Sequence, residues 1–154
     1  MTDLRVAVVD VYPVDLSRDG WKVLLCERSV GTRSPGAWEV VHGRIEEGET
    51  PVHAAVRELG EETGLAPKAL YTIASHPFYV AALDSVLMAV TFAALVDPRA
   101  TVTLGPEHSR FAWLSFADAA DRSTWPRAEE HLRWIGKLLR SGTAGPAEDV
   151  LRVR

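Results

Sequence analysis

The sequence predicts an α/β protein in which a mixed β-sheet lies between helices as an α/β/α sandwich. The first observation is size and composition, because 154 residues, 47% of them apolar and 25% charged, are typical of one globular domain. The second is a series of short runs rich in Val and Leu, which have the length of strands. The third is one early helical pattern, followed by further helical patterns near the C-terminus. We therefore expect a single domain over residues 1–154.

Strands and loops are expected before the first helix. The apolar runs RVAVVDVY and KVLLCER have strand composition, and Asp19-Gly20 between them is typical of a turn. A following segment rich in Gly, Ser and Pro indicates a loop, and WEVVHG after it indicates a short strand that ends at Gly43. In order, these are a strand at 5–12, a strand at 22–28, a loop at 28–37 and a strand at 38–43.

The clearest predicted element is a helix that starts after Thr50. Thr50 is a good N-cap and Pro51 suits the first helical position. Apolar residues then recur at i, i+3, i+4 and i+7 and form one stripe. Gly64 suits the left-handed position after the helix, which places Leu65 where it can pack back on Leu59. The stripe consists of Val52, Ala55, Val56 and Leu59.

Further strands and helices are expected after residue 68, in the order β-β-β-α-α. Apolar runs predict strands at 69–81, 85–96 and 111–115. Between the last two we expect a loop at 97–110, with Thr101–Leu104 as a candidate short strand. Helical spacing predicts helices at 116–122 and 127–140. The tail at 141–154 is expected to start flexible and then to add a short strand or stay loose.

Charge and composition exclude several classes of protein. The net charge of −4 argues against a basic surface for polymeric nucleic acid, although bound metal ions would still allow small phosphorylated ligands. Cys26 is the only cysteine and lies in an apolar run, so we expect a buried thiol and no intrachain disulfide. The first residues lack the layout of a signal peptide, and no apolar run has the length of a membrane span. A cytoplasmic protein without membrane contact is therefore expected.

Three carboxylates share one side of the predicted helix. With Val52 at 0° and about 100° per residue, Glu58, Glu61 and Glu62 lie at about 240°, 180° and 280°, beside the apolar stripe. Like charges at i+3 and i+4 destabilise a helix by a few tenths of a kcal/mol each, and the helix dipole disfavours anions at the C-terminal end. A solvated helix face is one explanation. The other is a site for hard divalent cations, which prefer carboxylate oxygens.

The spacing of these residues favours the cation site. The segment GRIEEGETPVHAAVRELGEETGL, from Gly43 to Leu65, fits Gly-x5-Glu-x7-Arg-Glu-U-x-Glu-Glu-x-Gly-U, in which U is a bulky aliphatic residue. A chance match is on the order of one in 10⁷ for a chain of this length. The pattern is that of the Nudix box, and the chain resembles Nudix hydrolases over residues 5–140. The resemblance implies a Nudix-type α/β/α sandwich that cleaves a diphosphate linkage with Mg²⁺ or Mn²⁺.

The resemblance also implies roles for residues of the box. Glu58, Glu61 and Glu62 would be metal ligands, with the Gly43 carbonyl completing the shell. Arg57 and Glu49 would form a supporting ion pair that orients the loop and the helix. The residues assigned to catalysis are Glu61, Glu62, Arg57 and Glu107.

The general base and the substrate contacts lie partly outside the box. Some relatives use a box glutamate as base and others use one from a later loop. Glu107, followed by His108 and then Trp113-Leu114, resembles the pattern of members similar to dihydroneopterin triphosphate pyrophosphatase. It is therefore a candidate base or additional metal ligand, and a solvated loop acid is the alternative. The candidate substrate contacts are Arg28, Trp38 and Arg44, of which Trp38 also suits a core position.

Substrate choice stays open among small phosphorylated compounds. A (deoxy)nucleoside or dihydroneopterin triphosphate is favoured because marks of other subfamilies are missing. Ala81 and Ala82 stand where ADP-ribose and diadenosine polyphosphate hydrolases have Pro and Tyr. LLCERSVGTR resembles part of a coenzyme A diphosphatase signature whose remainder is absent. A non-catalytic nucleotide-binding Nudix module is the alternative from another class, and a homodimer is compatible with the family.

Overall fold

The computed structural model describes residues 1–17 and 20–154, so Asp19 of the expected turn lies outside the described residues. Strands and helices follow one another in the order that the sequence predicts. They are β1 (Asp3–Asp15), β2 (Lys22–Arg28), β3 (Trp38–Glu39), β4 (Val41–Arg44), α1 (Pro51–Thr63), β5 (Ala69–Val80), the 3₁₀ turn η1 (Ala81–Leu83), β6 (Ser85–Leu95), β7 (His108–Ser115), α2 (Phe116–Arg122), α3 (Arg127–Leu138), the 3₁₀ turn η2 (Gly145–Ala147) and α4 (Glu148–Leu151).

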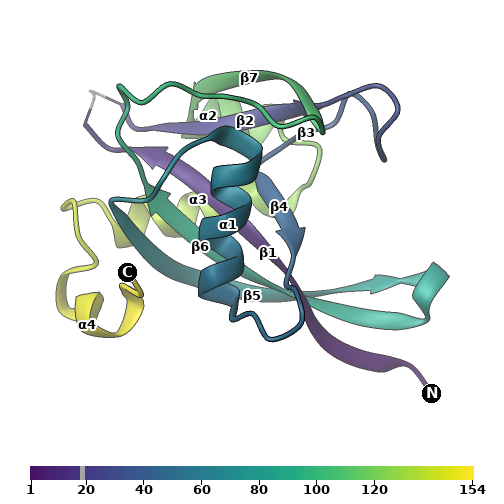
Figure 1. Cartoon of the computed structure of the whole chain (residues 1–154). Helices are drawn as coiled ribbons and strands as arrows, with labels where there is room; N and C mark the ends of the chain where they lie inside the picture. The colour runs from purple at the N-terminus through teal and green to yellow at the C-terminus, as the bar shows by residue number, and fades with distance from the viewer. Residues whose placement is uncertain (18–19) are drawn as a thin grey trace.

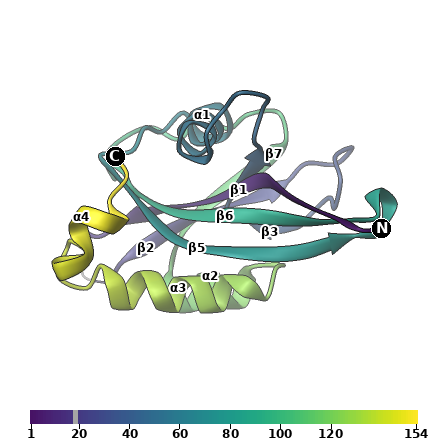
Figure 2. The ribbon, with the colours of Figure 1, turned by 90° about the horizontal axis from the view of Figure 1, so that it is seen from below.

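A mixed sheet forms the middle layer. Strand β1 runs parallel to β6 along nearly its whole length, and β5 is antiparallel to β6. On its other side β1 pairs antiparallel with β4 over Val8–Val11 and with β2 at Val14 and Asp15. Strand β2 pairs antiparallel with both β3 and β7. Helix α1 covers one face, and α2 and α3 cover the other (Figures 1 and 2), which confirms the predicted α/β/α sandwich.

Alternation along β1 supplies two cores, one on each face of the sheet. Val9 and Val11 point toward α1, whereas Tyr12 and Val14 point toward α2 and α3, and all four are almost fully buried. The α1-side cluster also holds Cys26, which is 1% exposed, so the expected buried thiol is confirmed. Burial raises the pKa of that thiol to about 12, so it is an inert core group.

Helix α1 has the predicted boundaries because its signals are local. The Thr50 side chain accepts a hydrogen bond from the His53 backbone N–H at 3.2 Å. Gly64 has φ 72°, and its N–H donates to the Gly60 carbonyl at 2.8 Å. Leu59 and Leu65 lie in the same α1-side cluster. The stripe therefore fixes which face of the helix is buried, and the carboxylates follow on the flank.

Three predictions about strands are wrong in detail. The single strand expected at 38–43 is divided, because β3 pairs with β2 while β4 pairs with β1, and the chain changes partner at Val40. The strands of the described residues do not include the short strand considered at Thr101–Leu104. That segment instead contacts the end of α1. Strand β7 begins at His108, three residues earlier than expected.

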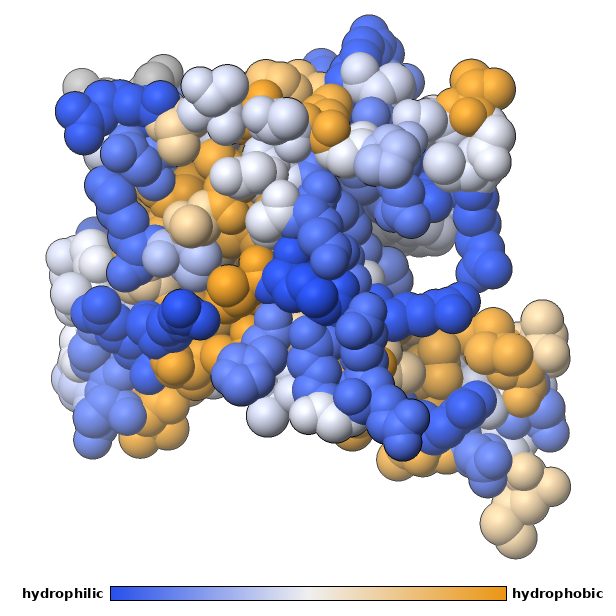
Figure 3. Space-filling view, in the orientation of Figure 1, coloured by the Kyte–Doolittle hydropathy of each residue, from blue (hydrophilic) through white to orange (hydrophobic). Residues whose placement is uncertain are grey.

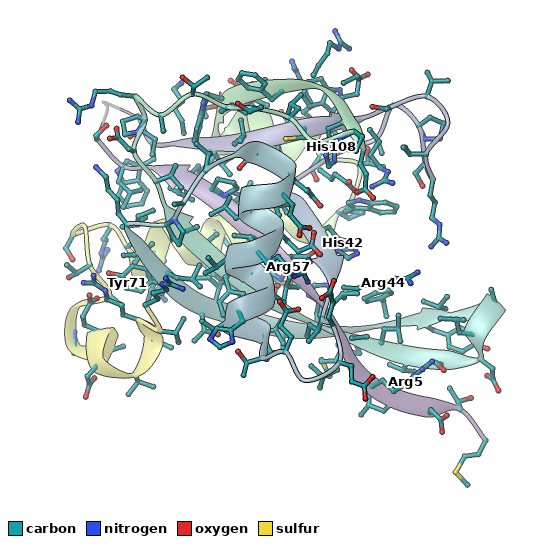
Figure 4. The ribbon with its side chains drawn as sticks, in the orientation of Figure 1. Arg5, His42, Arg44, Arg57, Tyr71 and His108 are labelled. Atoms are coloured by element: carbon teal, nitrogen blue, oxygen red, sulfur yellow. The ribbon has the colours of Figure 1, made fainter. Side chains whose placement is uncertain are left out.

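The C-terminal segment returns to the sheet. Arg152 forms a bridge with Tyr71, and the Tyr71 hydroxyl donates to Glu148 at 2.9 Å. Tyr71 lies at the edge of the sheet beside this segment (Figure 4). No helix among the described residues is long and apolar enough to cross a membrane.

Candidate active site

The site forms where the end of α1 meets β4 and the loop before β7. Gly43 on β4 lies directly against Glu58 on α1, so closely that a Cβ at residue 43 would lie 1.9 Å from the Glu58 Cδ. Only glycine permits this approach, although its φ is not in the left-handed region. The strand and the helix therefore hold a backbone segment and a carboxylate in contact.

Arg57 organises one side of the site. Its Nε and Nη2 donate to the two carboxylate oxygens of Glu49, both at 2.8 Å, in a bidentate pair. Nη1 donates to Glu58 at 2.7 Å and to Glu61 at 3.2 Å, and Nη2 also donates to the Arg44 carbonyl at 2.8 Å. All five guanidinium N–H groups are thus used. The hydrogen bonds from Arg57 lower the pKa of Glu49 to about 2, and those to Glu49 and Glu58 raise the pKa of Arg57.

Glu62 is the most perturbed acid of the site. Its carboxylate is buried, and Oε2 has no hydrogen-bond partner. Burial, followed by the negative charges of Glu58, Glu39 and Glu107, raises the pKa of Glu62 to about 9. Burial also raises the pKa of Glu58, against the effect of Arg57. A cation placed among these acids would reduce the repulsion between them and would give Glu62 Oε2 a partner.

A buried chain of polar groups lies behind Glu62. The His108 Nε2 is 3.1 Å from Glu39 Oε1, and its Nδ1 is 3.8 Å from Glu62 Oε2, too far for a hydrogen bond. Arg28 donates to the same Glu39 oxygen at 2.9 Å, and the Trp125 indole N–H reaches the other oxygen at 3.3 Å. Burial raises the pKa of Glu39, but hydrogen bonds from His108, Arg28 and Trp125 outweigh it and lower that pKa.

A second pair, of the half-buried His42 and the buried Asp10, supports β4. His42, which precedes Gly43, lies opposite Asp10 on β1, and its Nδ1 is 2.6 Å from Asp10 Oδ1. Arg127 on α3 donates to the other oxygen of Asp10 at 3.3 Å. Burial raises the pKa of Asp10, yet the hydrogen bond and charge of His42 lead to a lowered value. His42 therefore ties the strand beside Gly43 to Asp10 of β1 and, through Arg127, to α3.

The loop that carries Glu107 is attached to the end of α1. The backbone N–H groups of Thr103 and Gly105 donate to the carbonyls of Thr63 and Glu62, at 2.8 and 3.1 Å. These bonds satisfy carbonyls that a helix end leaves free. A Cβ on Gly105 would lie 2.8 Å from the Glu61 carbonyl oxygen, so glycine is needed for this approach. Glu107 is exposed, and its charge acts on both Glu58 and Glu62.

The candidate residues fall into two groups. The structure brings together, along one side of α1, Gly43, Glu49, Arg57, Glu58, Glu61, Glu62 and Glu107. Of the three proposed substrate contacts, Arg28 and Trp38 lie at the paired strands β2 and β3, whereas Arg44 lies on β4. Arg28 is tied to Glu39, Trp38 packs on the α3-side cluster between Arg110 and Arg122, and the Arg44 side chain is exposed (Figure 4).

Several residues of the site are not evident from the sequence. Contacts between distant elements place these residues. Glu39 on β3 meets His108 on β7, His42 on β4 meets β1, and Gly105 in the loop meets α1. The only sequence signal is a polar residue inside an apolar strand, as in WEVVH. Such a residue is unusual enough in a buried strand to suggest a partner.

The side chains are not arranged as a formed metal site. Among the described residues, no three His, Cys, Asp or Glu side chains converge as metal ligands. Glu58 and Glu61 instead turn their oxygens to Arg57. The donor set nevertheless suits a hard cation, because it offers carboxylate oxygens and leaves the buried Glu62 Oε2 without a partner.

Comparison with known proteins agrees with this geometry. The NUDIX domain family matches residues 3–135. The chain is 43% identical over 89 residues to an octanoyltransferase of Myxococcus xanthus, covering 56% of this chain and 25% of that protein. It is 36% identical over 69 residues to a CTP pyrophosphohydrolase of Escherichia coli K12, covering 45% and 50%. The chain thus spans half or less of these curated relatives.

A solved structure supports the fold. The E. coli dihydroneopterin triphosphate pyrophosphohydrolase aligns with a TM-score of 0.66, over 82% of this chain and 91% of that one. The identity is 21%, so this likeness concerns the fold alone.

Proposed function

The chain belongs to the Nudix domain family, and we propose that it is a hydrolase that cleaves a diphosphate linkage in a small phosphorylated substrate. The observation that carries the proposal is the group of acids at the end of α1, among which Glu62 is buried. Glu62 Oε2 lacks a hydrogen-bond partner, the Glu58 carboxylate lies against Gly43, and both acids have raised pKa values. An isolated structural role would not favour such a costly arrangement, since buried carboxylates are normally paired.

We propose that Mg²⁺, or Mn²⁺ in its place, binds to Glu58, Glu61 and Glu62 with the Gly43 carbonyl. Nudix domain proteins generally use divalent metal ions, which suits the oxygen donors found here. When bound, the ion would supply positive charge for the phosphate oxygens and lower the pKa of a water molecule. Binding requires Glu58 and Glu61 to turn from Arg57, whose bidentate bond to Glu49 does not depend on them.

The protein's own groups would then complete the reaction. A water oxygen attacks phosphorus, the bond from phosphorus to the bridging oxygen breaks, and the leaving phosphate takes the electron pair. Glu107 would accept the proton of that water, because its loop is fixed to the end of α1 by two backbone hydrogen bonds. Arg57 positions the helix against the loop at Glu49 and β4 at the Arg44 carbonyl.

We propose a nucleoside or pterin triphosphate as substrate, in agreement with the partial match to a CTP pyrophosphohydrolase. Of the residues first considered for substrate contacts, Arg44 has the most accessible side chain. Arg28 and Trp38 would act indirectly, Arg28 through Glu39 and Trp38 through the packing of β3. ADP-ribose, coenzyme A and dinucleoside polyphosphates are the alternative substrates.

The test is a substrate panel with Mg²⁺ or Mn²⁺, in which released phosphate and pyrophosphate are quantified. We expect hydrolysis of at least one nucleoside or pterin triphosphate, and loss of most of that activity in Glu61→Gln. Retained activity in that variant would remove Glu61 from the metal site. If no compound is hydrolysed but one binds tightly, the chain is a binding module, and the proposal is wrong.

A further inference from the structure

An arm of three strands extends from the body of the molecule, away from α1 and α3 (Figures 1 and 2). We define the arm as residues 3–6 of β1, 77–80 of β5 and 85–88 of β6. The register is regular across it, with Leu4 opposite Val86 and Val86 opposite Tyr79. No helix of the described chain covers this end of the sheet in either view.

One face of the arm is apolar and exposed. Residues opposite one another share a face, so Leu4, Val86 and Tyr79 form one row across the strands. Leu4 is 66% exposed and Tyr79 57% exposed, whereas Val9 further along β1 is fully buried. A parallel row contains Val6, Met88 and Pro77, and Val6 is 60% exposed. Figure 3 shows this apolar surface beyond the polar flank of α1.

The arm also has an open edge. Strand β4 accompanies β1 only from Val8 to Val11, extended by one hydrogen bond from Ile45 to the Ala7 carbonyl. Among the described residues, 3–6 pair with β6 alone. An exposed, apolar edge strand is a template for another strand. A protein that retains one needs either a partner or a feature that prevents pairing.

We propose that two copies of this chain associate through this edge, with residues 3–5 of each copy paired antiparallel around a two-fold axis at Leu4. This register places Asp3 of one copy opposite Arg5 of the other, twice, on the face opposite Leu4. The two Leu4 side chains then meet and join the apolar rows of both copies. The short edge complements itself in charge and in hydropathy.

Other registers are less favourable. An axis at Arg5 places two arginines opposite each other, and an axis at Asp3 does the same with two aspartates, and like charges directly opposite destabilise a strand pair. The Arg5 guanidinium is held in place by its hydrogen bond to Ser85 Oγ at 3.0 Å, and it lies on the arm as Figure 4 shows. The charges thus favour the axis at Leu4 over an axis at either neighbouring residue.

The resulting dimer has a continuous sheet in the order β5-β6-β1-β1-β6-β5. Its contact is small, because only a short run of residues pairs in each copy. Small interfaces belong to weak or transient complexes, so we expect association that depends on concentration. The inference does not depend on the proposed hydrolase, since none of its residues belongs to the acidic site.

Sedimentation velocity over a range of concentrations tests the proposal on the full chain. The wild type should shift from monomer to dimer with concentration. Arg5→Asp places four acids at the axis and should raise the dissociation constant at least about tenfold. The double variant Asp3→Arg/Arg5→Asp reverses both charges, restores the pairing and should regain most of the affinity.

The control is Leu83→Lys, in the exposed turn η1 outside both apolar rows, which should dimerise like the wild type. A wild type that is monomeric at every soluble concentration would overturn the proposal. It would also be overturned if the double variant associated no better than Arg5→Asp, or if Leu83→Lys abolished the dimer.

Discussion

Gly43 provides a sharp test of the site, because its lack of a side chain is what admits Glu58. In Gly43→Ala the new Cβ would lie 1.9 Å from the Glu58 Cδ and 2.2 Å from Oε1. An ordinary contact is 3.4 Å or more, so the Glu58 carboxylate must withdraw by about 1.5 Å. The withdrawal breaks the hydrogen bond of 2.7 Å that Arg57 donates to Glu58.

The expected magnitudes follow from that displacement. A hydrogen bond to a charged group contributes about 1.5–3 kcal/mol, and partial exposure of Arg57 and Glu58 reduces this to about 1–2 kcal/mol of stability. For a chain of this length the melting temperature should fall by about 2–8 °C. Moving a catalytic group by more than 1 Å costs about 10²-fold in rate, so we expect kcat/KM to fall at least that much.

The assay combines steady-state hydrolysis of the best substrate with thermal unfolding followed by circular dichroism. Gly60→Ala is a matched control, because it introduces the same methyl group on α1, where the nearest heavy atom is the Leu65 carbonyl oxygen at 4.0 Å. It should keep wild-type activity and gain up to about 1 kcal/mol of stability. Wild-type kcat/KM in Gly43→Ala would refute the role given to the contact between Gly43 and Glu58.

Three further predictions concern the loop before β7 and the α3 face. Glu107→Gln should lower turnover at least about tenfold without changing the melting temperature, and unchanged turnover would return the role of base to a glutamate of the box. Gly105→Ala should destabilise the protein by about 1–3 kcal/mol and also lower turnover, because its Cβ would lie 2.8 Å from a backbone oxygen of α1; a stability equal to wild type would contradict this. Burial lowers the pKa of His131, so folding disfavours its protonation, and the free energy of unfolding should fall as the pH drops below about 6.5. Urea unfolding at several pH values should show a smaller fall in His131→Gln, and an equal fall would exclude this histidine as its source.

Helix α1 could be predicted from the sequence because its determinants are local. Thr50, the apolar stripe and Gly64 each act within a few residues, and the structure has the same helix boundaries. The spacing of the box likewise places its acids on the flank of that helix, with Gly43 on the strand before it. The apolar periodicity of α1 and the closely spaced residues of the box were therefore sufficient to predict this helix and the side on which its acids lie.

The remaining features depend on contacts between distant residues. The chain changes partner strand at Val40, which depends on pairings with β1 and β2 that the sequence of 38–43 does not reveal. Polar and apolar residues alternate at Thr101–Leu104, which is compatible with a strand, but hydrogen bonds to the end of α1 set the place of this segment. The burial of Glu39 and His108 is equally non-local, because each is satisfied by residues of other elements.

The open edge of β1 is another non-local property. The sequence predicts one apolar strand at 5–12, and the structure extends it to Asp3–Asp15, yet β4 covers only part of it. The exposure of Leu4 and Val6 follows from where β4 ends. The proposed dimer therefore depends on topology more than on the composition of the strand.

The most direct test of the central claim is titration calorimetry of Mg²⁺ into the protein, with a non-hydrolysable nucleotide analogue present. The claim is that the acids at the end of α1 are held together in order to bind a divalent cation. It predicts saturable Mg²⁺ uptake by the wild type and a loss of that uptake in Glu58→Gln and Glu62→Gln, both still folded. No uptake of Mg²⁺ or Mn²⁺ by the wild type, or equal uptake by these variants, would contradict it.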